Sequence, residues 1–121
     1  MSTHTCDALI VSCIDFRLQK NIKKWLEKNF SDRTYDYVGY AGAVKDLLTI
    51  TKQLDISVKL HHINQVVLIN HEDCGAYAKE GTKERHAQDL RKAKQVILAL
   101  YPRLEIETYY LHLDGEFEKV N

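Results

Sequence analysis

The stretch DALIVSCIDFR, residues 7–17, decides the fold class. Residues 7–13 form a short and nearly continuous apolar run, which is typical of a strand that is covered on both faces. Residues 18–30 follow with apolar side chains at helical spacing, and this periodicity predicts an amphipathic helix. A buried strand that leads into such a helix is the start of a βα unit, so we expect a mostly parallel sheet.

The alternation of strand and helix continues to the end of the chain. Further strands are predicted at residues 34–40, 65–70 and 105–113, and further helices at residues 43–60 and 82–102. The Asp-Gly pair at 114–115 then turns the chain into a short edge strand at 116–120. This order predicts a single α/β domain over residues 1–121. We expect a mostly parallel four-stranded sheet with helices on both faces, plus the short C-terminal edge strand.

Composition excludes several classes of function. Lys plus Arg and Asp plus Glu number 17 each among 121 residues, and this balance argues against binding to nucleic acid, which needs an excess of basic residues. No apolar stretch approaches the roughly 18 residues that span a membrane, and the first residues lack the features of a signal peptide. We therefore expect a cytoplasmic protein. In that reducing compartment, three cysteines are more typical of metal ligands or reactive thiols than of disulfides.

Three metal-ligating side chains follow two of the predicted strands. Cys13 ends the first strand, and His71 and Cys74 come after the strand at 65–70, where Gly75 is expected to let the backbone bend. Parallel strands end at the same edge of a sheet, so the three side chains can converge there. Two thiolates and one imidazole suit Zn²⁺ and leave a fourth position open, as in catalytic sites. Each residue alone has a simpler explanation, but their combined placement favours a metal site.

Asp15 and Arg17 follow Cys13 at alternate positions. A carboxylate beside a zinc ion could accept a hydrogen bond from a water and orient it. An arginine paired with that carboxylate would keep it ionised. Taken alone, the two residues are better explained as an ordinary ion pair at the start of the next helix.

The pattern C-x-D-x-R, followed by H-x-x-C-G, resembles the β-class carbonic anhydrases. The matching residues are Cys13, Asp15, Arg17, His71, Cys74 and Gly75, and the resemblance extends over about residues 7–120. It implies a β-carbonic anhydrase-like fold and one zinc ion per chain, held by Cys13, His71 and Cys74. It also implies a zinc lyase that hydrates carbon dioxide to bicarbonate by means of a zinc-bound hydroxide.

Further roles follow from the same resemblance. Asp15 would orient the hydroxide while Arg17 holds Asp15, and in a closed resting state Asp15 would itself be a zinc ligand. Gly42 and Gly75 match positions next to the substrate. Members of the family bury their sites between subunits, so the resemblance implies a homodimer or a higher homo-oligomer. An uncovered strand at the edge of the sheet would favour the same association.

Three features depart from the family pattern. The first strand begins by about residue 7, so the usual N-terminal helical arm, with the polar amide that it lends to the pocket, has no counterpart. GYAGA at 39–43 stands in place of the usual Arg-Asn-Ala-Gly, and Asn70 stands where glycine is more usual. Two alternatives therefore stay open. One is a related zinc hydrolase that acts on carbon disulfide or carbonyl sulfide, and the other is a non-catalytic zinc-binding oligomeric domain.

The remaining candidate residues give weaker signals. Tyr40 and Tyr77 are either walls of the pocket or ordinary loop aromatics. His86, near the start of the third helix, could shuttle protons because imidazole titrates near neutral pH, but a solvent-exposed histidine is the favoured interpretation. Cys6 has no partner motif and is interpreted as incidental. The other histidines are interpreted as surface or packing residues: His4, His61, His62 and His112.

Overall fold

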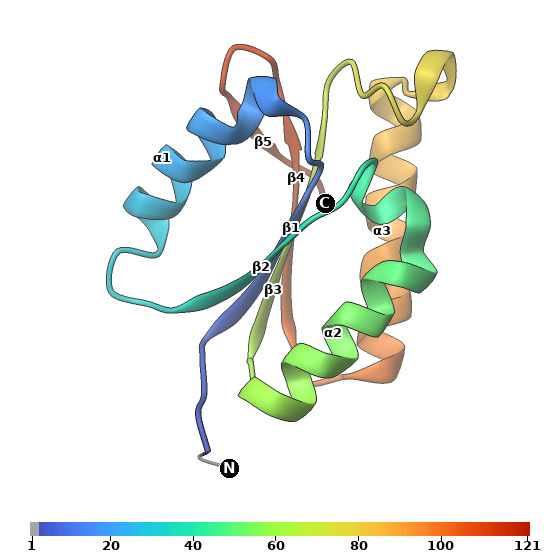
Figure 1. Cartoon of the computed structure of the whole chain (residues 1–121). Helices are drawn as coiled ribbons and strands as arrows, with labels where there is room; N and C mark the ends of the chain where they lie inside the picture. The colour runs from blue at the N-terminus through green and yellow to red at the C-terminus, as the bar shows by residue number, and fades with distance from the viewer. Residues whose placement is uncertain (1–2) are drawn as a thin grey trace.

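One mixed sheet organises residues 3–121, the part of the chain that the computed structural model describes (Figure 1). Its strands are β1 Ala8–Ser12, β2 Tyr35–Gly39, β3 Gln65–His71, β4 Glu105–Leu111 and β5 Phe117–Lys119. Their order across the sheet is β2-β1-β3-β4-β5. Strands β1 to β4 are parallel, and β5 pairs antiparallel with β4. The predicted parallel sheet with a short C-terminal edge strand is confirmed.

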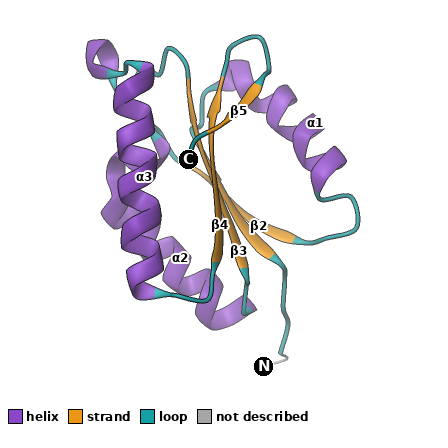
Figure 2. Cartoon of the chain, turned by 180° about the vertical axis from the view of Figure 1, so that it is seen from behind, coloured by secondary structure: helices purple, strands orange, loops and turns teal. Residues whose placement is uncertain are grey.

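Three α-helices of the described residues cover the two faces of this sheet (Figure 2). α1, Gln19–Asn29, lies on one face, whereas α2, Leu47–His61, and α3, Lys83–Leu100, lie on the other. Side chains of β1 alternate between the two layers, so Ile10 packs with residues of α1 and Leu9 packs with residues of α2 and α3. The helices on both faces are as predicted, and they explain the continuous apolar run of β1.

The helix predicted at 43–60 begins later than its apolar spacing indicates. Ala43–Asp46 forms a 3-10 turn, and α2 begins at Leu47. The reason is local, because the Asp46 side chain accepts a hydrogen bond from the Thr49 N–H at 3.2 Å and so caps the α-helix there. The turn that precedes the cap places residue 42 close to the end of β1.

The helix predicted at 82–102 begins at its expected cap. Thr82 Oγ1 accepts a hydrogen bond from the Arg85 N–H at 3.1 Å. The helix ends at Leu100, shortly before Pro102, the one proline of the chain. α3 therefore runs along β3 and β4, and its first turns lie near the loop that follows β3 (Figure 1).

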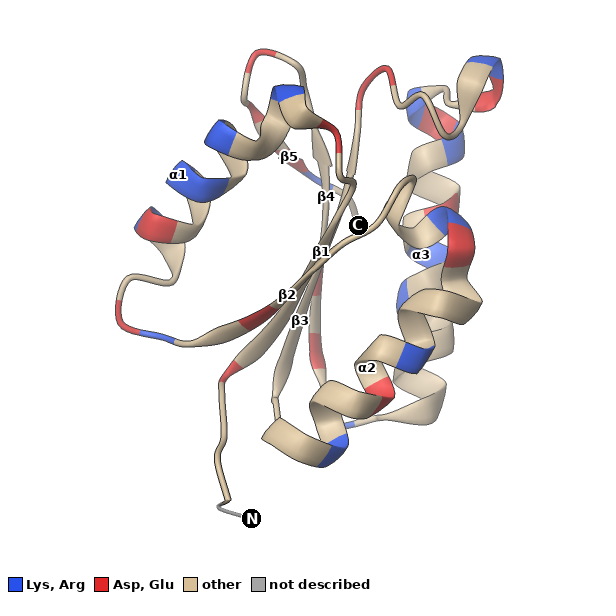
Figure 3. Ribbon diagram, in the orientation of Figure 1, with Lys and Arg blue, Asp and Glu red and all other residues tan. Residues whose placement is uncertain are grey.

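Charged residues are found mostly in the helices and loops, and few of them lie in the strands (Figure 3). On α1, for example, Lys20, Lys23 and Lys24 are exposed. Among the described residues, no helix has both the length and the apolar character that a membrane crossing requires. The concentration of functional groups is instead found where β1 and β3 end.

Candidate functional site

Cys13, His71 and Cys74 come together at the carboxyl edge of the sheet. Cys13 follows β1, His71 is the last residue of β3, and Cys74 lies in the loop after it. Because β1 and β3 are parallel neighbours, their ends lie side by side. The three donor atoms lie within 4.8 Å of one another, and all three side chains are buried. We call these three residues the ligand set.

The two ring nitrogens of His71 have different surroundings. Nδ1 lies 2.7 Å from the Glu72 carbonyl oxygen, and a carbonyl only accepts, so Nδ1 carries the proton. In the neutral imidazole Nε2 then has a free lone pair, and within the described residues it is buried without a hydrogen-bond partner. A buried acceptor without a partner is costly, and ligation of a metal would satisfy it. This orphaned nitrogen shows that the site fits a metal ion.

The two thiols of the ligand set influence each other. Their sulfur atoms are 4.0 Å apart, and the hydrogen bond between them lowers the pKa of Cys13 and raises the pKa of Cys74. The Gly42 N–H also donates to Cys13 Sγ at 3.4 Å and favours the Cys13 thiolate. A bound cation would let both thiols ionise, because coordination deprotonates a thiol outright. Two sulfurs and one imidazole nitrogen are a donor set typical of catalytic zinc.

Asp15 and Arg17 form a bidentate ion pair beside the ligand set. Arg17 Nη2 donates to Asp15 Oδ2 at 2.7 Å, and Arg17 Nε donates to Asp15 Oδ1 at 3.1 Å. These hydrogen bonds hold the pKa of the Asp15 carboxyl at about 2. Asp15 Oδ2 is 3.9 Å from His71 Nε2. The carboxylate is therefore ionised at neutral pH, held by Arg17, and turned toward the ligand set.

Asp73, which was not among the residues predicted from the sequence, also belongs to this network. Arg17 Nη1 donates to Asp73 Oδ2 at 3.0 Å, and Nη2 donates to the Asp73 carbonyl oxygen at 2.9 Å. Asp73 also has a φ of 57°, in the left-handed region. The sharp bend between the two ligands of this loop thus lies at Asp73, and the prediction that Gly75 provides it is wrong. Aspartate tolerates this conformation better than most residues. Its position between His71 and Cys74 was the sequence feature that could have indicated a left-handed residue in this turn.

An open cavity of about 550 Å³ leads to the ligand set. Its wall is largely apolar, with Ile14, Phe16 and Ala41 around Cys13. Ile14 and Phe16 are 61% and 86% exposed, which is unusual for side chains of this size. The cavity is therefore accessible to small, uncharged molecules.

The two glycines that were predicted to contact the substrate occupy different places. Gly75 is exposed and lines the cavity. Gly42 is buried behind Cys13, where its N–H supports the sulfur. Contact with a substrate stays a prediction for both residues. The backbone N–H of Gly42 donates a hydrogen bond to the sulfur of Cys13 and so helps to hold that side chain.

Alanine at position 42 tests that task. Gly42 has a φ of +80°, and an added Cβ would meet Ala76 Cβ at 3.1 Å and Lys45 Cβ at 3.2 Å. We expect Gly42→Ala to lower the free energy of unfolding by roughly 1–2 kcal/mol, measured by urea denaturation of the metal-free protein. Gly75→Ala is the matched control, because nothing lies within 4 Å of its added Cβ. Equal losses in the two variants would contradict this account.

A buried polar network lies behind the ligand set. Asn70 Nδ2 donates to Tyr77 Oη at 3.1 Å and lies 2.9 Å from His86 Nδ1. Tyr77 Oη donates in turn to Asp89 Oδ2 at 2.6 Å. Tyr77 is buried and packs against both cysteines of the ligand set, so it is not a wall of the open cavity. Tyr40 is also turned away, since its Oη donates to Asp46 Oδ2 at 2.7 Å.

The favoured interpretation of His86 as a solvent-exposed residue is wrong. Its ring is fully buried between Tyr77 and Tyr110. Burial lowers the pKa of His86 to about 4, so it lacks the ionisation near neutral pH that a proton shuttle needs. The helical period contained the signal, because His86 lies one turn before the buried Leu90 on the same face of α3.

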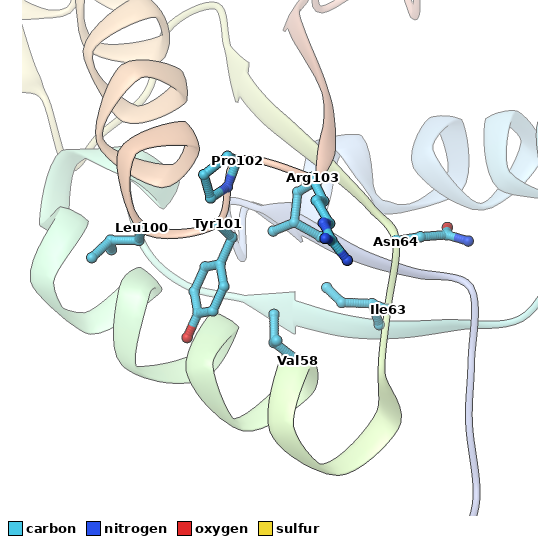
Figure 4. A pocket seen from close by; sticks show the side chains of 8 residues that line it. Val58, Ile63, Asn64, Leu100, Tyr101, Pro102 and Arg103 are labelled. Carbon is cyan, nitrogen blue, oxygen red and sulfur yellow. The ribbon is translucent and has the colours of Figure 1, made fainter.

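A second cavity, of about 340 Å³, lies near the amino ends of β3 and β4, at the end of the sheet away from the ligand set (Figure 4). Val58, Ile63 and Tyr101 supply much of its wall, and Arg103 supplies its charge. None of its lining residues is a cysteine, histidine, aspartate or glutamate. It therefore offers no counterpart to the ligand set.

Comparison with known proteins agrees with this geometry. Residues 3–121 match the protein family described as "Putative carbonic anhydrase". The chain belongs to the putative carbonic anhydrase family. A similar member is an uncharacterized protein of Rickettsia bellii. The two sequences are 30% identical over an alignment of 131 residues, which covers 93% of this chain and 80% of that protein. An uncharacterized protein of Rickettsia conorii is 31% identical over 131 residues, covering 93% of this chain and 70% of that protein.

Solved carbonic anhydrases share the fold of this family member. The enzyme from Glaciozyma antarctica superposes with a TM-score of 0.71 at 18% identity, covering 100% of this chain and 85% of that one. The enzyme from Streptococcus mutans has a TM-score of 0.67 at 15% identity, covering 98% and 84% of the two chains. The β-carbonic anhydrase from Trichomonas vaginalis has a TM-score of 0.67 at 15% identity, covering 99% and 85%. The predicted β-carbonic anhydrase-like fold is confirmed.

Proposed function

We propose that this protein is a zinc-dependent lyase that hydrates carbon dioxide to bicarbonate. The observation that carries the proposal is the buried Nε2 of His71, which has no partner and lies beside two thiols and the ionised Asp15. Cys13, His71 and Cys74 would hold one zinc ion per chain. When bound, zinc supplies the Lewis acidity that makes water a nucleophile near neutral pH.

The role of Asp15 follows from its charge and position. An ionised carboxylate accepts hydrogen bonds and cannot donate them. Asp15 would therefore accept a hydrogen bond from the attacking water, which orients an oxygen lone pair of that water toward the substrate carbon. Arg17 fixes the carboxylate through two hydrogen bonds, and Asp73 holds Arg17 from the other side. The reaction forms one C–O bond, opens one C=O bond to a single bond, and releases a proton to solvent as bicarbonate forms.

The shape of the site suits the substrate. Carbon dioxide is small and uncharged, and the cavity presents the apolar side chains of Ile14, Phe16 and Ala41. Gly75 lines the same cavity, and we place the substrate against its exposed backbone. The buried Gly42 would act on the substrate only indirectly, through Cys13.

A second candidate function is hydrolysis of carbonyl sulfide or carbon disulfide. It is favoured by the loop at 39–43, where Gly39 and Tyr40 stand in place of the usual Arg-Asn before Ala41. These molecules need the same nucleophile, but they are larger than carbon dioxide because sulfur replaces one or both oxygens.

A second copy of the chain would complete the rim of the cavity. Ile14 and Phe16 are exposed beside the site, and a partner surface would remove both from water. We therefore propose a homodimer or a higher homo-oligomer. Light scattering of the purified protein measures its molar mass in solution and so tests this proposal. A monomer at assay concentrations would contradict this part of the proposal.

Parallel assays on one zinc-loaded preparation test the function. We expect stopped-flow measurements to show faster hydration of carbon dioxide than hydrolysis of carbonyl sulfide or carbon disulfide, the latter two measured by release of hydrogen sulfide. Release of hydrogen sulfide without hydration of carbon dioxide would establish the second candidate instead. Bound zinc without either activity would contradict both and leave a non-catalytic zinc-binding domain.

A further inference from the structure

A second group of metal-ligating side chains lies near the amino ends of β1 and β2, at the end of the sheet away from the ligand set. Cys6 precedes β1, Asp36 lies on β2, and His61 is the last residue of α2. One sulfur, one carboxylate oxygen and one imidazole nitrogen from these residues lie within 4.8 Å of one another. From the sequence, Cys6 was interpreted as incidental because it has no partner motif, and His61 was interpreted as a surface or packing residue. The three residues are far apart along the chain.

Two side chains of this group, those of His61 and Asp36, are hydrogen-bonded to each other, and an ion bound by both atoms would replace that hydrogen bond. His61 Nδ1 lies 2.6 Å from Asp36 Oδ2, and Ser57 Oγ donates to the same oxygen at 2.7 Å. The side chains of His61 and Asp36 are 26% and 30% exposed, so the group is sheltered but open to solvent. Asp36, Ser57 and His61 also line a surface hollow of about 250 Å³. A hydrated ion can therefore reach the side chains of Asp36 and His61.

The backbone holds the segment that carries Cys6 in place. The Cys6 N–H donates to the His61 carbonyl oxygen at 3.0 Å. One residue later, the Asp7 N–H donates to the Thr34 carbonyl oxygen at 3.1 Å, and the Thr34 N–H donates back to Asp7 Oδ2 at 2.9 Å. The backbone of Cys6 is thus fixed beside the end of α2, and its Sγ lies 3.6 Å from the Ala8 carbonyl oxygen and within 4.8 Å of the other two donor atoms. A preformed arrangement lowers the entropic cost of binding.

The charges of the group favour a cation. Burial would raise the pKa of Asp36, but hydrogen bonds from His61 and Ser57 outweigh it and keep the carboxyl ionised. Burial and the negative charge of Asp36 raise the pKa of the Cys6 thiol. A cation would reverse this effect, because it stabilises both the thiolate and the neighbouring carboxylate.

We propose that Cys6, Asp36 and His61 form a second metal site, which binds Zn²⁺ or a similar divalent ion such as Co²⁺. Mixed sulfur, nitrogen and oxygen donors are the ligands that such ions take in proteins, whereas Mg²⁺ and Ca²⁺ take oxygen. The ring of His4 lies beside that of His61, with the centroids 4.7 Å apart, so a second imidazole stands next to the three donors. The site would fasten the N-terminal segment to β2 and α2.

This site is independent of the proposed catalytic zinc. Cys6 and Cys13 lie at opposite ends of β1, and at about 3.3 Å per residue the strand separates them by roughly 20 Å. No residue belongs to both groups. An ion at one site therefore contributes no ligand to the other, and each site can be removed without the other.

Metal stoichiometry in a chain without the catalytic ligand set tests the proposal. The double variant Cys13→Ser/Cys74→Ser, titrated with Co²⁺, is expected to bind about one equivalent per chain and to show a thiolate-to-cobalt charge-transfer band. Adding Cys6→Ser should abolish the band. No band in the double variant, although it is folded by circular dichroism, would overturn the proposal.

A pair of adjacent substitutions gives the second measurement, in a chain whose other residues are unchanged. Wild-type protein is expected to hold about two zinc equivalents, and His61→Asn about one. His62→Asn is the matched control, because His62 is exposed and outside the group, and its left-handed φ of 55° suits asparagine. Equal zinc content in the two variants would contradict the site. Wild-type protein that hydrates carbon dioxide while it holds only one zinc ion would refute this site and leave the proposed function standing.

Discussion

Cys74→Ser is expected to abolish zinc binding at the candidate catalytic site, and hydration of carbon dioxide with it. Cys74 is buried and supplies one of the two sulfurs, and a serine hydroxyl is a poor ligand for zinc at neutral pH. Loss of an outer residue that merely supports a ligand already costs roughly 10–100-fold in affinity, so loss of a ligand should cost more. Zinc affinity measured by competition with a chromophoric chelator gives the size of the effect.

The second metal site must be removed before this result is interpreted. We therefore compare Cys6→Ser with Cys6→Ser/Cys74→Ser, since the single variant leaves the ligand set whole and any zinc that it retains belongs to that set. The metal-free forms of both proteins should melt at similar temperatures, which separates loss of ligation from loss of the fold. Unchanged zinc affinity in the double variant would remove Cys74 from the site.

Asp15→Asn is expected to keep zinc and to lose most of the turnover. The asparagine side chain has nearly the same shape, but its amide can donate hydrogen bonds and carries no charge, so it no longer selects the required orientation of the attacking water. It also loses the ion pair with Arg17 that holds the carboxylate. Groups that orient or transfer protons in this way contribute roughly 10²–10⁴-fold to rate, and we expect kcat to fall within that range.

A matched control for this variant is available in an exposed turn. Asp32→Asn makes the same chemical change at a position that is far from the ligand set in the fold. It should change neither zinc content nor turnover. Full activity of Asp15→Asn, with zinc bound, would show that the carboxylate has no part in the reaction. Loss of zinc from Asp15→Asn would instead make Asp15 a ligand, as in the closed state that the family resemblance implies.

The position of the site was predictable because it depends on strand order. Once residues 7–13 and 65–70 are taken as buried parallel strands, Cys13 and His71 must end at the same edge of the sheet. The packing of the helices was also predictable, because the spacing of apolar residues shows which face of each helix is buried. Neither inference needs the detailed path of a loop.

The features that were missed depend on short-range backbone conformation and on contacts across the fold. The start of α2 at Leu47 is set by a local hydrogen bond to Asp46, which periodicity does not report. Asp73, with its left-handed φ, is hydrogen-bonded by Arg17 from a distant part of the chain. His86 was misassigned because its neighbours Asn70 and Tyr77 come from β3 and from the loop that follows it. The grouping of Cys6 with residues of β2 and α2 likewise appears only when the strands are placed side by side.

The pH dependence of carbon dioxide hydration tests the central claim most directly. Arg17 holds the pKa of Asp15 at about 2, so Asp15 is ionised throughout the range between about pH 6 and 9. The account therefore predicts that kcat/KM of the zinc-loaded protein rises with pH through a single ionisation, that of the attacking water, and that Asp15→Asn lies far below this curve at every pH. A rate no higher than that of buffer across the whole range, with one zinc ion bound by the ligand set, would contradict it.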